Sequence, residues 1–461
     1  MCGAPLAATL KIGTWVTRLG KQFFGTDGIR GVAGEPPLDA TTVSAFGLAL
    51  GSDILTAHGG GYVLIAMDTR ESGPDLASHV AGGLAARGVT TQFAGVLTTP
   101  GVAYLTRLGA AAGVMISASH NPFADNGIKV FGPTGFKLPD VEESAIEDEI
   151  LRLLPARPVH SAPLLPQTEL ALPYLEFLLT TLSAPLTGLH LVLDCGNGAA
   201  SHLAPELFRR AGATVTAIHC QPNGRNINLN CGALHVESLA ARVAAEGAHG
   251  GVAFDGDADR AIFVAGSGRI VNGDAVMLIA ARSLQSRGLL PGNTIVSTVM
   301  SNLGLEQALE RDGIRMLRTP VGDKYVLEEM ERTGAALGGE QSGHMIFRSF
   351  ATTGDGMLTA LQIFDIVQHS GRSLDHLSAD LSLYPQLLVN VRVKARRPLE
   401  QLDRVRAEIA ACEKELDGAG RVLVRFSGTE PLARVMVEGR DPARVEALTH
   451  KIAAAIQSEL G

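Results

Sequence analysis

Three short apolar runs in the first part of the chain each end in an aspartate. They are YVLIAMD at 62–68, LHLVLD at 189–194 and GGVAFD at 250–255. The runs are continuous rather than alternating, which is typical of strands that are buried on both faces of a sheet. Segments with helical periodicity follow or intervene, and each ends just before a glycine, a common helix stop. These predicted helices are 73–87, 201–211 and 236–246.

Strands that alternate with helices predict parallel α/β layers, and their recurrence indicates internal duplication. A third α/β block follows the first two, with strands expected at 294–299 and 315–319. Helices are expected after Ser301 and at 324–332. The proline-rich stretch 155–172 has few periodic apolar positions and is interpreted as a linker.

The last part of the chain changes character. Apolar and polar residues alternate at 387–393, 421–427 and 434–438, which is typical of an antiparallel sheet with one solvated face. A helix is expected from Asp441, with Pro442 in its first turn. The sequence therefore predicts a small α+β domain at this end, with two helices covering one face of its sheet.

These patterns divide the chain into five segments. We expect a flexible leader, three related α/β domains with mixed or parallel sheets, and a smaller α+β C-terminal domain. The predicted ranges are 1–21, 22–172, 173–273, 274–384 and 385–461. The count agrees with the length of 461 residues, because a domain commonly has about 100–200 residues.

Charge and cysteine content narrow the possible partners. A net charge of −8 opposes binding to nucleic acid or to an anionic membrane surface, so an anionic substrate needs a local cluster of arginine and lysine. No apolar stretch reaches the roughly 18 residues that favour a membrane span. The five cysteines are an odd number at long spacings, which favours a reducing compartment. We expect a cytoplasmic protein, monomeric or homodimeric, with a small-molecule substrate.

The first chemical motif is DGDADR at 255–260, directly after a predicted buried strand. Asp255, Asp257 and Asp259 would repel one another without a cation between them, and hard ions such as Mg²⁺ prefer carboxylate oxygens. A calcium loop does not fit, because its sixth and twelfth positions would be Arg260 and Gly266. A phosphatase that uses its first aspartate as the nucleophile remains an alternative.

The second motif is SASHNP at 117–122, where Asn-Pro favours a turn that displays Ser119 and His120 at a strand end. A serine in that place can accept a phosphoryl group, and Lys129 supplies a cation nearby in the sequence. The alternative is a capped turn whose hydroxyls bind the backbone. No Gly-x-Ser-x-Gly motif is present, which disfavours an esterase.

Three other motifs gain meaning only in combination. RFSGTEP at 425–431, with Arg434 after it, resembles an anion cradle but is also compatible with a hairpin turn. GGEQSGH at 338–344 could bind sugar hydroxyls or form a simple turn. FGTDGIRG at 24–31 is a glycine-rich loop with one arginine and lacks the spacing of a dinucleotide or P-loop motif.

Together and in this order, these motifs resemble the α-D-phosphohexomutase superfamily, and most closely its bacterial phosphoglucosamine mutase branch. The resemblance spans residues 22–458. Two further stretches are similar to the glucosamine branch, TVMSNLG at 298–304 and TPVGDK at 319–324. The motifs that carry the resemblance are FGTDGIRG, ISASHNP, DNGIK at 125–129, DGDADR, GGEQSGH and RFSGTEP.

The resemblance implies a phosphoserine at Ser119 and a Mg²⁺ ion held by that group and the three aspartates. It places the phosphoserine loop in domain 22–172 and the metal loop in domain 173–273. It places a sugar-binding loop in 274–384, with Glu340 and Ser342, and a phosphate-binding loop in 385–461. Residues near the reacting groups would be Arg30, His120, Lys129, Arg260 and His344. The phosphate-binding residues would be Arg425, Ser427, Gly428, Thr429 and Arg434.

The implied reaction interconverts glucosamine 6-phosphate and glucosamine 1-phosphate through a 1,6-bisphosphate. It is an isomerase reaction of amino sugar metabolism, and its product supplies UDP-N-acetylglucosamine and peptidoglycan precursors. Three alternatives stay open at this point. They are a mutase for glucose or mannose phosphates, a sugar phosphatase and a non-catalytic sensor.

Overall fold

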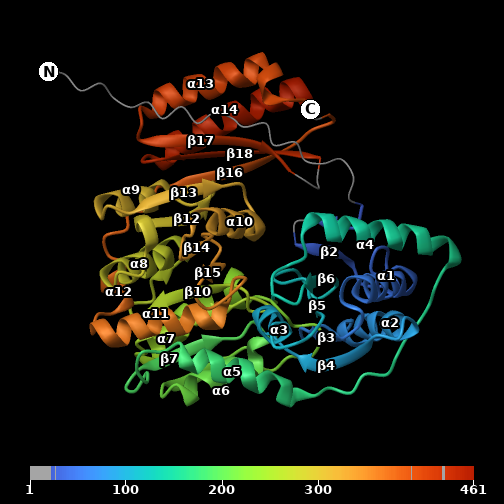
Figure 1. Ribbon diagram of the computed structural model, residues 1–461. Coiled ribbons are helices and arrows are strands. Elements are labelled where there is room, and N and C mark those ends of the chain that lie inside the picture. The colour runs from blue at the N-terminus through green and yellow to red at the C-terminus, as the bar shows by residue number, and fades with distance from the viewer. Residues whose placement is uncertain (1–21, 26, 396, 428–430) are drawn as a thin grey trace.

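The computed structural model describes residues 22–25, 27–395, 397–427 and 431–461. Its elements form four units, each built on one sheet, which we call domains 1 to 4 in chain order. Domain 1, in blue and cyan, lies to one side in Figure 1, and domain 4, in red, lies at the top next to domain 3. The predicted leader 1–21 lies outside the described residues.

Domain 1 is a six-stranded sheet with helices on its faces. The strand order is β1-β2-β6-β5-β3-β4. Its strands are β1 (Phe24–Gly25), β2 (Gly28–Val32), β3 (Tyr62–Met67), β4 (Thr90–Val96), β5 (Ala112–Ile116) and β6 (Asp125–Phe131). Its helices are α1 (Ala40–His58), α2 (Gly73–Ala86), α3 (Thr99–Thr106) and α4 (Asp140–Leu153).

A connector leads from domain 1 to domain 2. It contains two short 3₁₀ turns, η1 (Leu154–Ala156) and η2 (Thr168–Ala171), and runs down the outside of domain 1 (Figure 1). The predicted linker 155–172 corresponds to this segment, except that Leu172 already begins a helix.

Domain 2 has a five-stranded sheet in the order β11-β10-β9-β7-β8. Its strands are β7 (His190–Asp194), β8 (Thr214–Ile218), β9 (Gly250–Phe254), β10 (Ala261–Ala265) and β11 (Ile270–Val271). Its helices and turn are α5 (Leu172–Thr180), α6 (Ala200–Arg210), η3 (Gly232–Leu234) and α7 (Glu237–Glu246).

Domain 3 has a four-stranded sheet in the order β13-β12-β14-β15. Its strands are β12 (Thr294–Thr298), β13 (Arg315–Thr319), β14 (Leu337–Gly339) and β15 (Met345–Phe347). Its helices and turn are α8 (Gly273–Ser286), η4 (Pro291–Asn293), α9 (Leu303–Arg311), α10 (Asp323–Thr333), α11 (Gly356–Ser370) and α12 (Leu374–Leu377).

The three α/β sheets share one strand pattern. In each, a central strand (β3, β7 or β12) has a parallel neighbour on both sides, and one neighbour then pairs with an antiparallel strand (β6, β10 or β15). The common pattern agrees with the duplication that the sequence indicated. All three sheets contain antiparallel as well as parallel pairs, so none of them is purely parallel.

Domain 4 is an antiparallel sheet in the order β16-β18-β17, covered on one face by two helices. The elements are β16 (Gln386–Arg392), η5 (Leu399–Gln401), α13 (Asp403–Leu416), β17 (Gly420–Phe426), β18 (Leu432–Gly439) and α14 (Pro442–Leu460). The predicted α+β unit with two covering helices is therefore confirmed. The last helix was expected from Asp441, and Asp441 is the residue that caps α14, with Pro442 in the first turn.

The cores explain how the domains are held together. One continuous apolar cluster includes Leu64 of domain 1, Leu191 of domain 2 and Ile295 of domain 3, whereas domain 4 has a cluster of its own. Domain 4 meets domain 3 through polar contacts, since Arg421 donates to the carbonyl oxygen of Val299 at 2.7 Å. The fourth domain is thus the least tightly integrated by apolar packing.

Among the described helices, α1 alone is long and apolar enough to cross a membrane by length and composition. In the structure, 61% of the window Ala40–Ala57 is buried, and the helix packs against α2 and α4. A core helix has the same properties, so α1 is accounted for by packing within domain 1.

Candidate active site

Ser119 lies in the loop that follows β5. Its side chain is 1% exposed, and its φ of +51° is a left-handed conformation that residues other than glycine adopt rarely. Ser119 Oγ donates to Asp255 Oδ2 at 2.5 Å and lies 3.2 Å from His120 Nδ1. The loop therefore brings a hydroxyl of domain 1 into contact with a carboxylate of domain 2.

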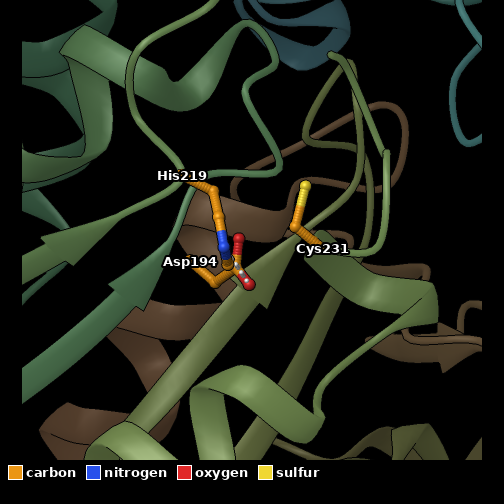
Figure 2. A group of neighbouring side chains, drawn as sticks. All are labelled: Asp194, His219 and Cys231. Carbon is orange, nitrogen blue, oxygen red and sulfur yellow. Dashed lines mark ion pairs between the residues drawn. The ribbon is translucent and has the colours of Figure 1, made fainter.

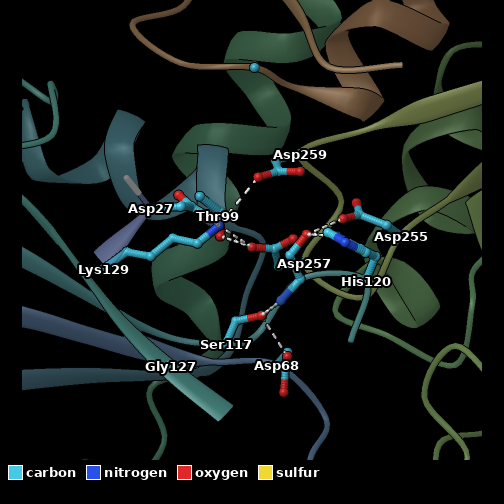
Figure 3. Close-up of polar contacts among 12 residues, drawn as sticks. Asp27, Asp68, Thr99, Ser117, His120, Gly127, Lys129, Asp255, Asp257 and Asp259 are labelled. Carbon is cyan, nitrogen blue, oxygen red and sulfur yellow. Dashed lines mark hydrogen bonds and ion pairs between the residues drawn. The ribbon is translucent and has the colours of Figure 1, made fainter. Parts of the chain in front are cut away.

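The backbone around Ser119 is held by both domains. Its N–H donates to Ser117 Oγ at 2.9 Å, and that hydroxyl donates to Asp68 Oδ2 at 2.6 Å (Figure 3). The Ser119 carbonyl oxygen accepts from Arg70 at 3.0 Å and from Asn228 Nδ2 at 2.9 Å. These four groups fix the unusual backbone conformation that points the hydroxyl at Asp255.

The aspartates lie in the loop that joins β9 to β10. Asp255, Asp257 and Asp259 are all buried, and one carboxylate oxygen of each lies within 4.8 Å of the others. Burial, reinforced by the charges of Asp259 and Asp257, raises the pKa of Asp255 well above its usual range. Asp257 Oδ1 accepts no hydrogen bond from any described residue. Three buried carboxylates so close together call for compensating positive charge.

Lys129 of β6 is one source of that charge. Its Nζ lies 2.9 Å from Asp257 Oδ2, 3.3 Å from Asp259 Oδ2 and 3.2 Å from Asp27 Oδ2 (Figure 3). Burial opposes its charged form, but these carboxylates hold the pKa of Lys129 well above its usual range. Burial likewise opposes ionisation of Asp259, whereas Lys129 and His344 hold the pKa of that carboxyl well below its usual range.

The aspartate cluster fits a divalent cation. Its donors are carboxylate oxygens only, the ligands that hard ions prefer, and the buried Asp257 Oδ1 has no hydrogen-bond donor among the described residues. Ser119 Oγ already touches Asp255, so a phosphoryl group on that oxygen would lie beside the same cluster. The sequence prediction that these residues form a metal site is supported by their geometry.

The loop between β14 and β15 contributes from domain 3. His344 Nδ1 lies 3.6 Å from Asp259 Oδ1, and the backbone of His344 pairs with that of Arg260. Glu340 Oε1 accepts from Gly322 N at 3.1 Å, and Ser342 Oγ donates to Glu340 Oε2 at 3.3 Å. Three domains therefore meet at the aspartate loop.

His344 carries opposing influences. Burial lowers its pKa, but Asp259 and other carboxylates outweigh burial and raise the pKa of His344 to about 9. At the same time, Gly354 N–H donates to Nε2 at 3.0 Å, a contact open only to the neutral ring. A cation on Asp259 would offset the carboxylate charge, which reconciles the hydrogen bond with the neutral form.

His120 and Arg30 complete the surroundings of Ser119. Burial, assisted by the nearby Arg260, lowers the pKa of His120 to about 4, so this imidazole is neutral at neutral pH. An Arg30 guanidinium nitrogen donates to Asp27 Oδ2 at 2.5 Å. Burial opposes it, yet Asp27 and Asp257 raise the pKa of Arg30 above its ordinary value, so its charge is retained.

The predicted phosphate loop lies at the end of the β17–β18 hairpin. Arg425 and Arg434 are directly opposite each other in the two strands, and Ser427 N donates to the carbonyl oxygen of Leu432 at 2.8 Å. Burial, followed by the charge of Arg434, lowers the pKa of Arg425. Two facing guanidinium groups favour an anion between them. Gly428 and Thr429 lie outside the described residues.

Comparisons with known proteins agree with this arrangement. Family models described as "Phosphoglucomutase/phosphomannomutase" match the chain in four parts, namely alpha/beta/alpha domains I, II and III and the C-terminal domain. They match residues 21–156, 173–268, 272–384 and 388–455. A curated "Phosphoglucosamine mutase" of Solibacter usitatus is 61% identical over 446 residues, which is 96% of this chain and 100% of that protein.

The chain belongs to the phosphoglucosamine mutase family. A second relative with that name, from Koribacter versatilis, is 50% identical and covers 96% of this chain and 98% of its own length. Among solved structures, a phosphoglucomutase/phosphomannomutase family protein from Burkholderia thailandensis has a TM-score of 0.77 at 26% identity, covering 94% of this chain and 97% of that chain. The fold is shared by an N-acetylphosphoglucosamine mutase from Aspergillus fumigatus, whose structure is a complex with GlcNAc-6P and magnesium. Its TM-score is 0.68 at 20% identity, and the match covers 95% of this chain and 96% of that chain.

The structure adds residues to this family member's site that sequence reasoning missed. Asp27 lies within the quoted motif FGTDGIRG, and both Lys129 and Lys137 contact it. Lys137 also contacts Asp323 of domain 3 at 2.6 Å. Asp68 ends one of the three apolar runs, which was a usable signal. Arg70 and Asn228 carry no comparable signal, because neither lies in a motif with recognisable chemistry.

Proposed function

We propose that this chain interconverts glucosamine 6-phosphate and glucosamine 1-phosphate, with Ser119 as the phosphorylated residue and a 1,6-bisphosphate as the intermediate. The observation that carries the proposal is the 2.5 Å contact between Ser119 Oγ and Asp255 Oδ2 in a buried cluster of three aspartates. Membership of the phosphoglucosamine mutase family supports the choice of sugar.

The proposed divalent ion is Mg²⁺, held by Asp255, Asp257, Asp259 and an oxygen of phosphorylated Ser119. When bound, Mg²⁺ neutralises charge on the phosphoryl oxygens and the carboxylates. Oxygen-only ligation favours this ion over softer metals. The magnesium in the A. fumigatus enzyme belongs to that protein and agrees with the choice.

The transfer itself is an exchange of phosphorus–oxygen bonds. In the first half, the bond from phosphorus to Ser119 Oγ breaks and a bond to the free sugar hydroxyl oxygen forms, while the sugar hydroxyl loses a proton and Ser119 Oγ gains one. In the second half, the other phosphate of the bisphosphate returns to Ser119, while Ser119 Oγ loses its proton and the released sugar oxygen gains one. Phosphoryl transfer of this kind depends on positioning and charge stabilisation, which Arg30, Lys129 and Arg260 supply.

His120 is placed to move the proton, because its neutral ring lies 3.2 Å from Ser119 Oγ. The raised pKa of Lys129 makes this lysine a poor proton donor and suits it to stabilising charge on the transferring group. His344, beside Asp259, completes the catalytic set as a positioning group. A pH profile of kcat in variants of His120 and Lys129 distinguishes the acid and base roles.

The substrate is proposed to bind between the loops of domains 3 and 4. Glu340 and Ser342 offer acceptors and a hydroxyl to the sugar. Arg425, Arg434 and Ser427 offer charge and a hydroxyl to the phosphate that is not reacting, together with Gly428 and Thr429. Because the sugar must turn around between the half-reactions, the phosphate-binding residues of domain 4 have to bind either phosphate of the bisphosphate.

The test is an assay of purified protein with glucosamine, glucose and mannose phosphates side by side. We expect kcat/KM to be highest for the glucosamine substrate, with no accumulation of inorganic phosphate. Preference for glucose or mannose phosphate would identify the other mutase branch instead. Stoichiometric release of inorganic phosphate would identify a phosphatase and refute the mutase proposal.

The remaining expectations concern the state of the protein. We propose that it acts in the cytoplasm as a monomer or homodimer on a small phosphosugar, without a nucleic acid or membrane partner. The net charge of −8 supports this, since it disfavours polyanionic surfaces. Light scattering coupled to size-exclusion chromatography gives the mass, and a trimer or larger assembly would contradict the proposal.

A further inference from the structure

A second cluster of potential metal ligands lies in domain 2, apart from the three catalytic aspartates. Asp194 ends β7, His219 follows β8, and Cys231 precedes η3. One ligand atom from each lies within 4.8 Å of the others, and His219 Nδ1 is 2.9 Å from Asp194 Oδ2. Figure 2 shows the imidazole and the carboxylate directed toward each other with Cys231 beside them. None of the three residues has a role in the proposed reaction.

The corresponding position in domain 1 shows what is unusual about Asp194. There, Asp68 follows the central strand β3 as Asp194 ends β7, and its Oδ2 accepts from Ser117 and lies 3.4 Å from an Arg70 nitrogen. Asp194 instead faces His219, while its Oδ1 accepts from Gly196 N at 2.9 Å. In domain 2 the partner of this aspartate is therefore an imidazole from the loop after β8, whereas in domain 1 it is a guanidinium from the loop after β3.

His219 adopts a φ of +46°, in the left-handed region that histidine, asparagine and aspartate enter more often than most residues other than glycine. A replacement at this position must tolerate the same backbone conformation.

We propose that Asp194 Oδ2, His219 Nδ1 and Cys231 Sγ bind one Zn²⁺ ion at a site separate from the catalytic cation. A mixed set of oxygen, nitrogen and sulfur ligands suits zinc, whereas magnesium prefers oxygen alone. Bonds of about 2.0–2.3 Å in a tetrahedral site separate neighbouring ligands by roughly 3.5 Å, so small side-chain rotations suffice.

Binding has a defined proton balance. The Cys231 thiol loses its proton to solvent and coordinates as the thiolate, and His219 coordinates through Nδ1 with its remaining proton on Nε2. Three protein ligands leave a fourth position for water. The His219 side chain is 32% exposed, in contrast to the fully buried Asp194 side chain, so the ion and the water can enter from that side.

The site connects to the phosphoserine loop through one segment. His219 and Cys231 lie at the two ends of segment 219–231, and Asn228 in that segment donates to the carbonyl oxygens of Ser119 and Asn121 at 2.9 and 3.1 Å. A metal that binds His219, Cys231 and Asp194 together would fix both ends of segment 219–231 and so restrict its movement. We therefore expect zinc to stabilise the support behind Ser119 without entering the reaction.

The experiment is a titration of the full chain with Co²⁺, a spectroscopic substitute for zinc, in excess Mg²⁺. Thiolate coordination to Co²⁺ produces a near-ultraviolet charge-transfer band, which an oxygen-only site cannot produce. We expect this band to saturate at one Co²⁺ per chain and to disappear on addition of Zn²⁺. Zn²⁺ should also raise the Tm of the Mg²⁺-loaded protein.

Variants separate this site from other thiols. Cys231→Ser and His219→Asn should abolish the zinc-dependent rise in Tm, and Cys231→Ser should abolish the band. Asparagine tolerates the positive φ at position 219, so His219→Asn tests the imidazole even if Cys231→Ser fails to fold. Cys412→Ser, in domain 4, and Cys2→Ser are matched controls that should keep both signals.

Three kinds of result would overturn the proposal. The first is the absence of any charge-transfer band at stoichiometric Co²⁺. The second is a band and a Tm shift that survive in both Cys231→Ser and His219→Asn. The third is a band that depends on another cysteine, whether Cys2, Cys195, Cys220 or Cys412, because this would assign the metal to other ligands.

Discussion

Replacing Lys129 with methionine should reveal how much of the active site's stability depends on charge compensation. The Lys129 Nζ faces Asp27, Asp257 and Asp259 within 3.3 Å and is 1% exposed. Methionine keeps most of the apolar stem and removes the charge. Breaking a buried ion pair on one side costs about 3–5 kcal/mol, because the remaining carboxylates stay buried without their partner.

The lower end of that range is expected here. Asp27 keeps its 2.5 Å contact with Lys137, and Asp259 still faces His344. Lys129 and its partners lie in domains 1 and 2, and a cooperative unit of about 150–250 residues shifts its Tm by about 2–4 °C per kcal/mol. A loss of about 3 kcal/mol therefore lowers the Tm of this unit by roughly 6–12 °C. Mg²⁺ restores positive charge at the same carboxylates, so most of this loss should disappear when the ion is added.

The assay is differential scanning calorimetry of both proteins, once with chelator and once with saturating Mg²⁺. Lys324→Met is the matched control, since its contact with Asp140 at 2.7 Å is partly open to solvent, with side chains 23% and 60% exposed. Exposed pairs contribute about 0–1 kcal/mol, and this control should not respond to Mg²⁺. A Lys129→Met protein as stable as the parent in chelator, or equally destabilised with and without Mg²⁺, would refute the reasoning.

The same variant should unfold at a higher pH when titrated with acid. Lys129 helps to hold the pKa of Asp27 and of Asp259 well below the usual range, although burial opposes it. The stability from such carboxyls is present above about pH 4, their unfolded value, and is lost as pH falls through the lower folded value. Without Lys129 the folded values rise, so the acid transition measured by circular dichroism should begin at a higher pH.

Three further predictions concern activity. Ser119→Ala should lose most activity and the phosphate detected by peptide mass analysis while keeping its circular dichroism spectrum; full activity would end the phosphoserine proposal. Activity should vanish with a chelator, return with Mg²⁺ and return only poorly with Zn²⁺. Asp257→Asn should weaken the activation by Mg²⁺. Activity that withstands exhaustive chelation would remove the metal from the mechanism. Arg425→Ala should mainly raise KM for the phosphosugar. Some loss of kcat is also expected because remote binding orients the sugar, while Ser119 phosphorylation should remain intact. Unchanged kinetics would mean that the loop is only a polar turn.

Much of the fold could be predicted because local patterns and the final packing agree. The apolar run ending in Asp255 is buried on both faces, as β9 between β7 and β10, and so its continuous hydrophobicity carried reliable information. The end of such a strand is where ligands bind in α/β sheets, which placed the aspartate loop correctly. Element ends differ by a residue or two, for example at Asp323, where α10 begins one residue before its predicted start.

The support of the site could not be predicted in the same way. Arg70 and Asn228 act on the carbonyl oxygen of Ser119, and a side chain that binds a distant backbone group leaves no periodic or spacing signal. Asp194, His219 and Cys231 are far apart along the chain and form no motif. Only the order β8-β7-β9 and the path of segment 219–231 bring them together.

The way Ser119 is held bears on how one site performs both half-reactions. Phosphorylation adds about −1.5 to −2 of charge at Oγ, so contacts with that oxygen must change during each cycle. The contacts from Arg70 and Asn228 are instead made to the carbonyl oxygen of Ser119, and the contact from Ser117 is made to its N–H. None of these contacts involves Oγ, so the chemistry of phosphorylation does not require them to change. The backbone can therefore keep one geometry while the buried aspartates and cations absorb the change in charge, which is the preorganisation that phosphoryl transfer requires.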